Sequence, residues 1–229
     1  MTSLFSYDPT IEQRKLLDEH LRLVLEVNKT HNLTRITSWE QAQVLHVEDS
    51  LVGLPELQQA PDGLYADLGS GGGFPGIPLA IMSGRKTILV DSVAKKMNAV
   101  NRIIVYLGLK NQITTYAGRI EDLSRQHPNE FAAVTARALS SLPSLLELAS
   151  PLLQLTGNLI CYKAQPGQEE IELACSLEDK LGMSFQSERQ VILSDGCTQR
   201  SILVFKKVKP AQVPLPRRVG MAQKRPYTS

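Results

Sequence analysis

The first sixty residues place apolar side chains at the spacing of one face of an α-helix. Thr10 and Gln13 fit a capping box that would begin such a helix. The apolar positions that follow it are Leu17, Leu21, Val24 and Leu25. A second box, at Ser38 and Gln41, precedes another helical pattern. We therefore expect residues 1–60 to form a helical N-terminal extension.

After residue 60 the helical pattern changes to short apolar runs separated by helices. Seven runs are strand-like, at residues 64–68, 86–90, 112–116, 131–138, 158–162, 190–194 and 201–208. The first five alternate with helices, which implies right-handed crossovers and a parallel sheet covered on both faces. The last two are joined through Asp195-Gly196 without room for a helix, so they should pair antiparallel. The sequence predicts an α/β domain over residues 61–208 with a mostly parallel, seven-stranded sheet.

The remaining residues, 209–229, are rich in proline, basic and without periodicity, which predicts an extended tail. The whole chain of 229 residues has a formal charge of +2, but seven basic and no acidic residues lie between Lys206 and the end. The rest of the chain therefore has a charge of −5. Charge alone leaves two interpretations open, a solvated tail or a local contact with a polyanion.

Composition narrows the class of protein further. The chain is 42% apolar and 21% charged, which is typical of folded proteins and excludes disordered and fibrous classes. Its three cysteines form no CxxC pair, and no set of ligands has metal-binding spacing, so we expect neither disulfides nor a metal. No apolar run approaches the roughly 18 residues of a membrane span, and the N-terminus lacks a signal-peptide pattern. We expect a cytoplasmic monomer without a membrane partner.

The most informative segment directly follows the first strand, where residues 67–78 read DLGSGGGFPGIP. At this place a parallel sheet leaves a crevice for ligands, and glycines let the backbone approach them closely. Gly71, Gly73 and Gly76 satisfy GxGxxG, the dinucleotide fingerprint, in which a helix N-terminus receives a pyrophosphate. Counted from Asp67, the same stretch also satisfies DxGxGxG.

The carboxylate that precedes the glycines favours the second template. A carboxylate at this position would repel a phosphate but can bind an ammonium group. S-adenosylmethionine has an amino-acid portion and a sulfonium, and it has no phosphate. In this template the cofactor is bound at Asp67, Gly69, Gly71 and Gly73. Asp91 ends the second strand, where a carboxylate can accept hydrogen bonds from the ribose of either ligand. S-adenosylmethionine is thus favoured, and a nicotinamide dinucleotide with an oxidoreductase activity is the alternative.

Other segments extend the comparison well beyond this loop. They are HNLTRIT from His31, HVEDSL from His46, GRIEDL from Gly118, TARALSSL from Thr135, YKA from Tyr162 and PRRVGMAQKRP from Pro216. In this order, and with the loop, they resemble the RsmG family, also called glucose-inhibited division protein B. That family methylates N7 of one guanine in small-subunit (16S) ribosomal RNA with S-adenosylmethionine. The resemblance implies a Rossmann-like class I methyltransferase fold and the small ribosomal subunit as partner.

The resemblance also implies roles for individual positions. Gly69 and Phe74 would line the cofactor site, and Asp91 would hold the ribose. Ile120 and Glu121 would lie beside the adenine.

Basic residues are implied on the RNA side of the same site. Arg137 matches a family residue at the mouth of the cofactor site. The positions implicated in activity or RNA contact are Arg119, Lys163 and Arg200. In the tail, the residues expected to meet RNA phosphates are Arg217, Arg218, Lys224 and Arg225.

Guanine N7 carries an in-plane lone pair and no proton, so its methylation requires neither a general base nor a covalent nucleophile. Alignment and electrostatics should supply the rate. We therefore expect Arg137 to position the substrate rather than to activate it. A ribosome-binding protein without catalysis is a further alternative, and the intact glycine loop argues against it.

Overall fold

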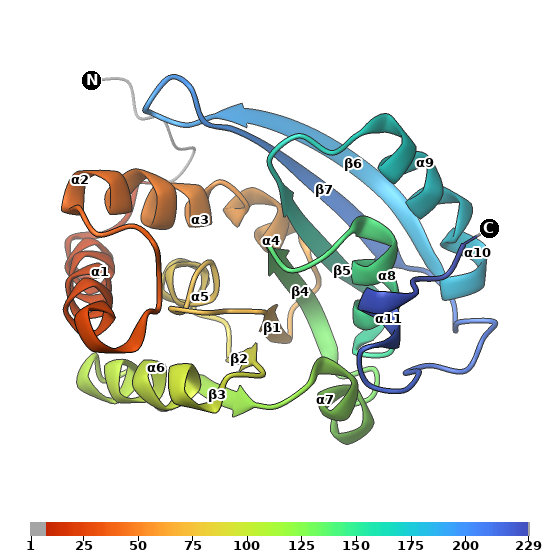
Figure 1. Cartoon of the computed structure of the whole chain (residues 1–229), viewed down its shortest axis with the longest axis horizontal. Helices are drawn as coiled ribbons and strands as arrows, with labels where there is room; N and C mark the ends of the chain where they lie inside the picture. Colours follow the sequence, from red (N-terminus) through yellow and green to blue (C-terminus); the bar gives the residue numbers. More distant parts are fainter. Residues whose placement is uncertain (1–7, 229) are drawn as a thin grey trace.

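A seven-stranded sheet runs through the centre of the molecule and has helices on both faces (Figure 1). The computed structural model describes residues 8–228. The strands are β1 (Leu64–Leu68), β2 (Thr87–Asp91), β3 (Ile113–Ala117), β4 (Phe131–Arg137), β5 (Leu153–Lys163), β6 (Met183–Ile192) and β7 (Gln199–Lys207). Their order is β3-β2-β1-β4-β5-β7-β6, with β1 to β5 parallel and β7 antiparallel to both of its neighbours. The predicted mostly parallel sheet with an antiparallel last pair is confirmed.

Two strands begin earlier than their apolar runs predicted, β5 by five residues and β6 by seven. In the first part of β5, Leu155 is exposed and Thr156 has a positive φ of 69°. The register with β4 shifts there, so this part shows no alternation of apolar and polar residues. β6 is an edge strand with exposed polar residues at 186–188. Both extensions depend on pairing with a neighbouring strand, which a hydrophobic pattern does not report.

The N-terminal helices begin where the capping boxes predicted. They are α1 (Ile11–His31), α2 (Trp39–Ala42), a π-helical segment (Gln43–Glu48), α3 (Asp49–Leu51) and α4 (Leu54–Gln59). The Thr10 hydroxyl accepts the Gln13 N–H (3.2 Å), and the Gln13 side chain accepts the Thr10 N–H (2.9 Å). The Ser38 hydroxyl accepts the Gln41 N–H in the same way (3.3 Å). Within residues 8–228, no helix is long and apolar enough to cross a membrane.

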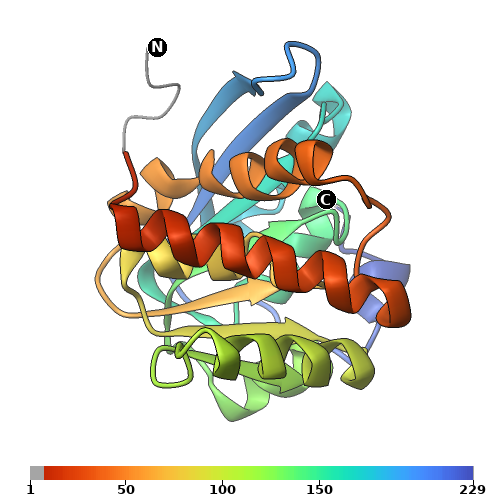
Figure 2. The same cartoon turned by 90° about the vertical axis from the view of Figure 1, so that its left-hand side faces the viewer.

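The N-terminal helices share a hydrophobic core with the rest of the protein. The other helices are α5 (Gly76–Ser83), α6 (Ala94–Tyr106), α7 (Ile120–Gln126), α8 (Leu142–Ala149), α9 (Gln168–Ser176), α10 (Glu178–Leu181) and α11 (Met221–Lys224). α1 packs across α5 and α6 on one face of the sheet (Figure 2). There Leu21 and Val24 join a core cluster with Phe74 and Ile77. The extension therefore supports the glycine loop from behind.

The C-terminal segment, expected as an extended tail, is folded against the body in its described part, residues 209–228. The Arg217 guanidinium pairs with the buried Glu147 carboxylate of α8 (2.5 Å) and lies 4.0 Å from the centre of the Tyr227 ring. The Lys180 ammonium of α10 donates to the Thr228 carbonyl (2.8 Å). A buried carboxylate needs a partner, and Arg217 supplies it. The segment is thus held in place by Glu147 and Lys180, which lie outside it in the sequence.

Candidate active site

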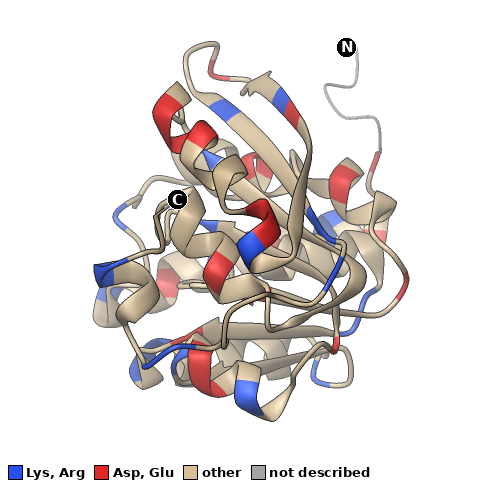
Figure 3. Ribbon diagram, turned by 90° about the vertical axis from the view of Figure 1, so that its right-hand side faces the viewer, with Lys and Arg blue, Asp and Glu red and all other residues tan. Residues whose placement is uncertain are grey.

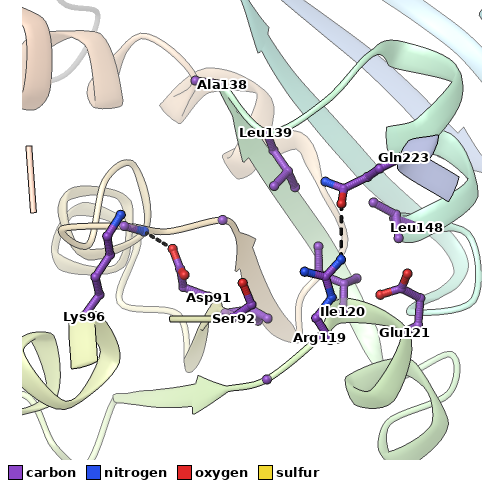
Figure 4. A pocket seen from close by; sticks show the side chains of 14 residues that line it. Asp91, Ser92, Lys96, Arg119, Ile120, Glu121, Ala138, Leu139, Leu148 and Gln223 are labelled. Carbon is purple, nitrogen blue, oxygen red and sulfur yellow. Dashed lines mark hydrogen bonds between the residues drawn. The ribbon is translucent and has the colours of Figure 1, made fainter. Parts of the chain in front are cut away.

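A cavity of about 310 Å³ lies beyond the carboxyl ends of β1, β2, β3 and β4 (Figure 4). We call it the strand-end cavity. Its lining includes six residues that were predicted to take part in binding or activity: Gly69, Gly71, Asp91, Arg119, Ile120 and Glu121. Other lining residues were not expected from the sequence, among them Lys96, Leu139, Leu148 and Gln223. This edge is where doubly wound sheets bind their ligands.

Backbone conformation shapes the polar side of the strand-end cavity. Gly69 and Gly71 have φ angles of +74° and +57°, in the left-handed region that favours glycine. A Cβ atom at Gly69 would lie 2.9 Å from the Leu139 side chain. The Gly71 N–H donates to Asp91 Oδ2 (3.2 Å), while Asp91 Oδ1 accepts the Val93 N–H (2.8 Å). The loop and the end of β2 are thereby held together around the cavity.

Asp67 lies beneath the glycine loop and not in the lining of the cavity. It is fully buried, and its two oxygens accept the Gly76 N–H (3.0 Å) and the Thr135 hydroxyl (2.8 Å). A Cβ atom at Gly76 would lie 2.8 Å from the same carboxylate, so glycine is required there. Burial raises the pKa of Asp67 to about 6, against the lowering effect of these hydrogen bonds. In place of the expected contact with a ligand, the Asp67 carboxylate forms hydrogen bonds that connect β1, β4 and the start of α5.

Gly73 and Phe74, also expected in contact with the ligand, do not line the strand-end cavity and belong to the buried side of the loop. Gly73 has a φ of +92°, and a Cβ atom there would lie 2.6 Å from Ile77. The Phe74 ring packs on the imidazoles of His20 and His46, with ring centres 4.5 and 4.6 Å apart. Burial lowers the pKa of His20 to about 3 and that of His46 to about 4, so both rings are neutral near pH 7. These residues shape the loop from its buried side.

A second cavity of about 440 Å³ adjoins the first, and Ala138 lines both. We call it the arginine cavity. It brings together Arg137 from the end of β4, Lys163 from the end of β5 and Arg200 from β7. Arg119, grouped with them by the sequence analysis, instead lies in the strand-end cavity and donates to the Gln223 side chain (3.3 Å; Figure 4). Three of the four expected basic residues are therefore gathered at one place.

Asp49, for which the sequence predicted no role, holds two of these cations. Its carboxylate is 2% exposed and accepts hydrogen bonds from Arg137 (2.8 Å) and from the Arg200 Nε atom (2.8 Å). The Arg137 guanidinium lies 6.0 Å from the centre of the Phe74 ring. One signal was present in the sequence, because Asp49 lies in the segment HVEDSL, which carries part of the family resemblance.

The charged residues that line the arginine cavity, counted together with their ion-pair partner Glu170, include one more positive than negative side chain. The Lys163 ammonium pairs with the Glu170 carboxylate (2.7 Å) and donates to the Ser140 carbonyl (3.4 Å). Two carboxylates, Asp49 and Glu170, therefore face three cations, and the buried His46 is neutral. The excess of positive charge suits an anionic ligand such as a nucleic-acid backbone.

The C-terminal segment contributes to the wall of the strand-end cavity. Gln223 lines it, and the Gly220 N–H donates to the buried Glu121 carboxylate (2.6 Å). Of the four basic residues expected to meet RNA, Arg217 is engaged by Glu147, whereas the exposed ones are Arg218, Lys224 and Arg225. Figure 3 shows Lys and Arg interspersed with Asp and Glu on this side of the molecule. A uniform basic face is thus not formed there.

The fold and the position of the strand-end cavity define an S-adenosylmethionine-dependent methyltransferase fold. The structure is similar to an O-methyltransferase from Bacillus cereus in complex with S-adenosylhomocysteine, with a TM-score of 0.59, 20% identity and coverage of 90% of this chain and 94% of that chain. It is also similar to geranyl diphosphate methyltransferase in complex with S-adenosylmethionine, with a TM-score of 0.57, 13% identity and coverage of 71% and 85%.

Sequence comparison identifies the family. The model of the GidB family, rRNA small subunit methyltransferase G, matches residues 13–201. The ribosomal RNA small subunit methyltransferase G of Carboxydothermus hydrogenoformans is 36% identical over 218 residues, 94% of this chain and 92% of that protein. The protein of the same name from Thermotoga neapolitana is 34% identical over 201 residues, 87% and 86% of the two chains. The chain belongs to this family, and the expected methyltransferase class with its S-adenosylmethionine cofactor is confirmed.

Proposed function

We propose that this protein transfers a methyl group from S-adenosylmethionine to N7 of a guanine in small-subunit (16S) ribosomal RNA. The observation that carries the proposal is the junction of two unlike cavities at Ala138. One is built by glycines and a strand-end carboxylate, and the other has an excess of positive charge. Such a pair suits a cofactor and an RNA nucleotide that must meet at their reacting atoms.

The residues of the strand-end cavity fit the cofactor. Asp91 ends β2 with its carboxylate in the lining, where it would accept hydrogen bonds from the ribose hydroxyls. Gly69 and Gly71 leave room for the methionine portion, and Ile120 and Glu121 would flank the adenine. When bound, the cofactor supplies an electrophilic methyl group on a sulfonium.

The anchoring of Asp67 argues against the dinucleotide alternative. Its carboxylate accepts the Gly76 N–H at the start of α5, the place where a dinucleotide fold receives its pyrophosphate. A pyrophosphate would have to displace a buried carboxylate. This arrangement favours a ligand without phosphates.

The arginine cavity would orient the guanine without proton transfer. N7 already presents its lone pair, so the residues there need to align the base and to hold its phosphates. Arg137 and Arg200 suit that task because Asp49 holds both guanidinium groups in place. The same carboxylate offsets the charge of Arg137, which reduces its repulsion with the cation formed at N7.

Methyl transfer to isolated small subunits tests the proposal. Subunits from a strain that lacks the enzyme are incubated with the protein and tritiated S-adenosylmethionine, and the digested RNA is examined for 7-methylguanosine. We expect one labelled guanine per subunit. A folded protein that binds S-adenosylhomocysteine yet forms no 7-methylguanosine would contradict the proposal. Thermal stabilisation by NADH and not by S-adenosylhomocysteine would support an oxidoreductase instead.

A further inference from the structure

A third hollow, of about 470 Å³, continues from the arginine cavity along the β6–β7 hairpin. Ala164 and Arg200 line both spaces. The hairpin projects beyond the neighbouring helices (Figure 2), and residues 164–166, which follow β5, line the hollow together with residues of both hairpin strands. We call this hollow the hairpin groove. An RNA strand with a nucleotide in the arginine cavity would reach it next.

Three glutamine side chains give the hairpin groove its chemical character. Gln190 of β6 and Gln199 of β7 are exposed and line the groove, together with Gln165 from the turn after β5. The Gln165 amide nitrogen donates to the Gln199 amide oxygen (2.6 Å), which leaves the Gln199 nitrogen available to a ligand. Within the described residues, the Gln190 amide has no hydrogen-bond partner. The groove thus presents donors and acceptors side by side.

Charge in the hairpin groove favours a base over a phosphate. Among the described lining residues the only charged ones are Arg200 and Glu188, and the Arg200 guanidinium is engaged by Asp49. Ile192, 58% exposed, adds an apolar surface beside the amides. Amides that donate and accept match the edges of an unpaired base, and an apolar side chain suits its face.

We propose that the hairpin groove binds the base of a single-stranded RNA nucleotide that flanks the methylated guanine. This inference rests on the proposed function, because it needs an RNA strand in the arginine cavity. It assigns recognition of the RNA around the target to Gln165, Gln190 and Gln199.

Removal of the three amides tests the proposal. In the variant Gln165→Ala/Gln190→Ala/Gln199→Ala, we expect the KM for small subunits and the Kd for the same subunits to rise about tenfold. The affinity for S-adenosylhomocysteine and the kcat should not change, because the cofactor cavity is untouched. Gln186→Ala is the matched control, since this exposed amide lies on β6 outside the groove. An unchanged subunit Kd in the triple variant overturns the proposal.

A second variant separates a base from a phosphate. Gln190→Lys adds a positive charge, which would tighten binding if the groove held the RNA backbone. If the groove reads a base, the lost amide should instead raise the Kd for subunits, so a lowered Kd overturns the proposal. Binding and methylation are measured together. A wild-type protein that binds subunits without methylating them would overturn the proposed function. In that case, the Kd values of the variants would still show whether the groove contacts RNA.

Discussion

The strand-end cavity and the arginine cavity share a wall but are built in different ways. The first is formed largely by a contiguous loop and strand ends, with backbone groups of Gly69 and Gly71 and the carboxylate of Asp91. The second is formed by charged side chains from β4, β5 and β7, and Asp49 from the N-terminal helices holds two of them. A site built from backbone tolerates change at distant positions, whereas a site built from paired charges depends on every partner.

The largest effect is expected from Asp49→Ala, which leaves Arg137 and Arg200 without their buried partner. We expect the free energy of unfolding to fall by about 3 kcal/mol and kcat/KM for subunits to fall about a hundredfold. Affinity for S-adenosylhomocysteine should stay the same. Urea unfolding, methyl transfer and calorimetry measure the three quantities. The control is Asp122→Ala, because its pair with Arg125 is exposed and should contribute less than about 1 kcal/mol.

A smaller effect, confined to the other cavity, is expected from Asp91→Asn. The asparagine side chain accepts hydrogen bonds only at its one oxygen, whereas the Asp91 carboxylate accepts them at two. We therefore expect the Kd for S-adenosylhomocysteine to rise about tenfold. The KM for subunits should not change. Asp62→Asn, at an exposed position before β1, serves as the control. A shift of the subunit KM in Asp91→Asn would show that the two cavities are coupled.

Two variants test the C-terminal segment, which lines the strand-end cavity through Gln223 and exposes three basic residues. Replacement of the exposed residues Arg218, Lys224 and Arg225 by alanine should weaken subunit binding and reduce the slope of log K against log salt by about 2. Gln223→Ala should instead weaken binding of S-adenosylhomocysteine a few-fold and leave that salt slope unchanged. Subunit binding across a salt series checks both. An unchanged slope in the alanine variant would show that these three basic residues do not contact RNA phosphates.

The smallest effect on activity is expected at Lys207, which lines neither of the two cavities. Its ammonium is buried and donates to the Ser150 hydroxyl (2.5 Å) and the Leu181 carbonyl (3.3 Å). Burial lowers its pKa from 10.5 to about 8. Between these values the unfolded chain binds more protons, so stability should rise with pH across that window.

The variant Lys207→Met should lose this dependence on pH while its methylation rate stays normal. Urea unfolding of both proteins from pH 7.5 to 10.5 makes the comparison. Parallel stability curves for the two proteins would show that Lys207 is not the titrating group.

The strand-end cavity was predictable because its determinants are local. Glycines at three alternate positions after a strand, and an acid at the end of the next strand, indicate a ligand site wherever the rest of the chain lies. Even so, Asp67 and Gly73 were expected in the lining of the cavity and are directed to the buried side of the loop. Sequence spacing does not tell which side of a loop a side chain faces.

The amino-acid sequence by itself determined the mostly parallel sheet with its antiparallel last pair, the helix starts at Thr10 and Ser38, and the glycine loop, because these depend on short-range patterns. Only the tertiary structure decided that Asp49 joins Arg137 to Arg200, across 88 and 151 positions in the chain. It alone placed Arg217 on Glu147 and made the basic C-terminal segment part of the wall of the strand-end cavity. The physical reason is that buried charges require partners, and folding chooses those partners in space and not along the chain.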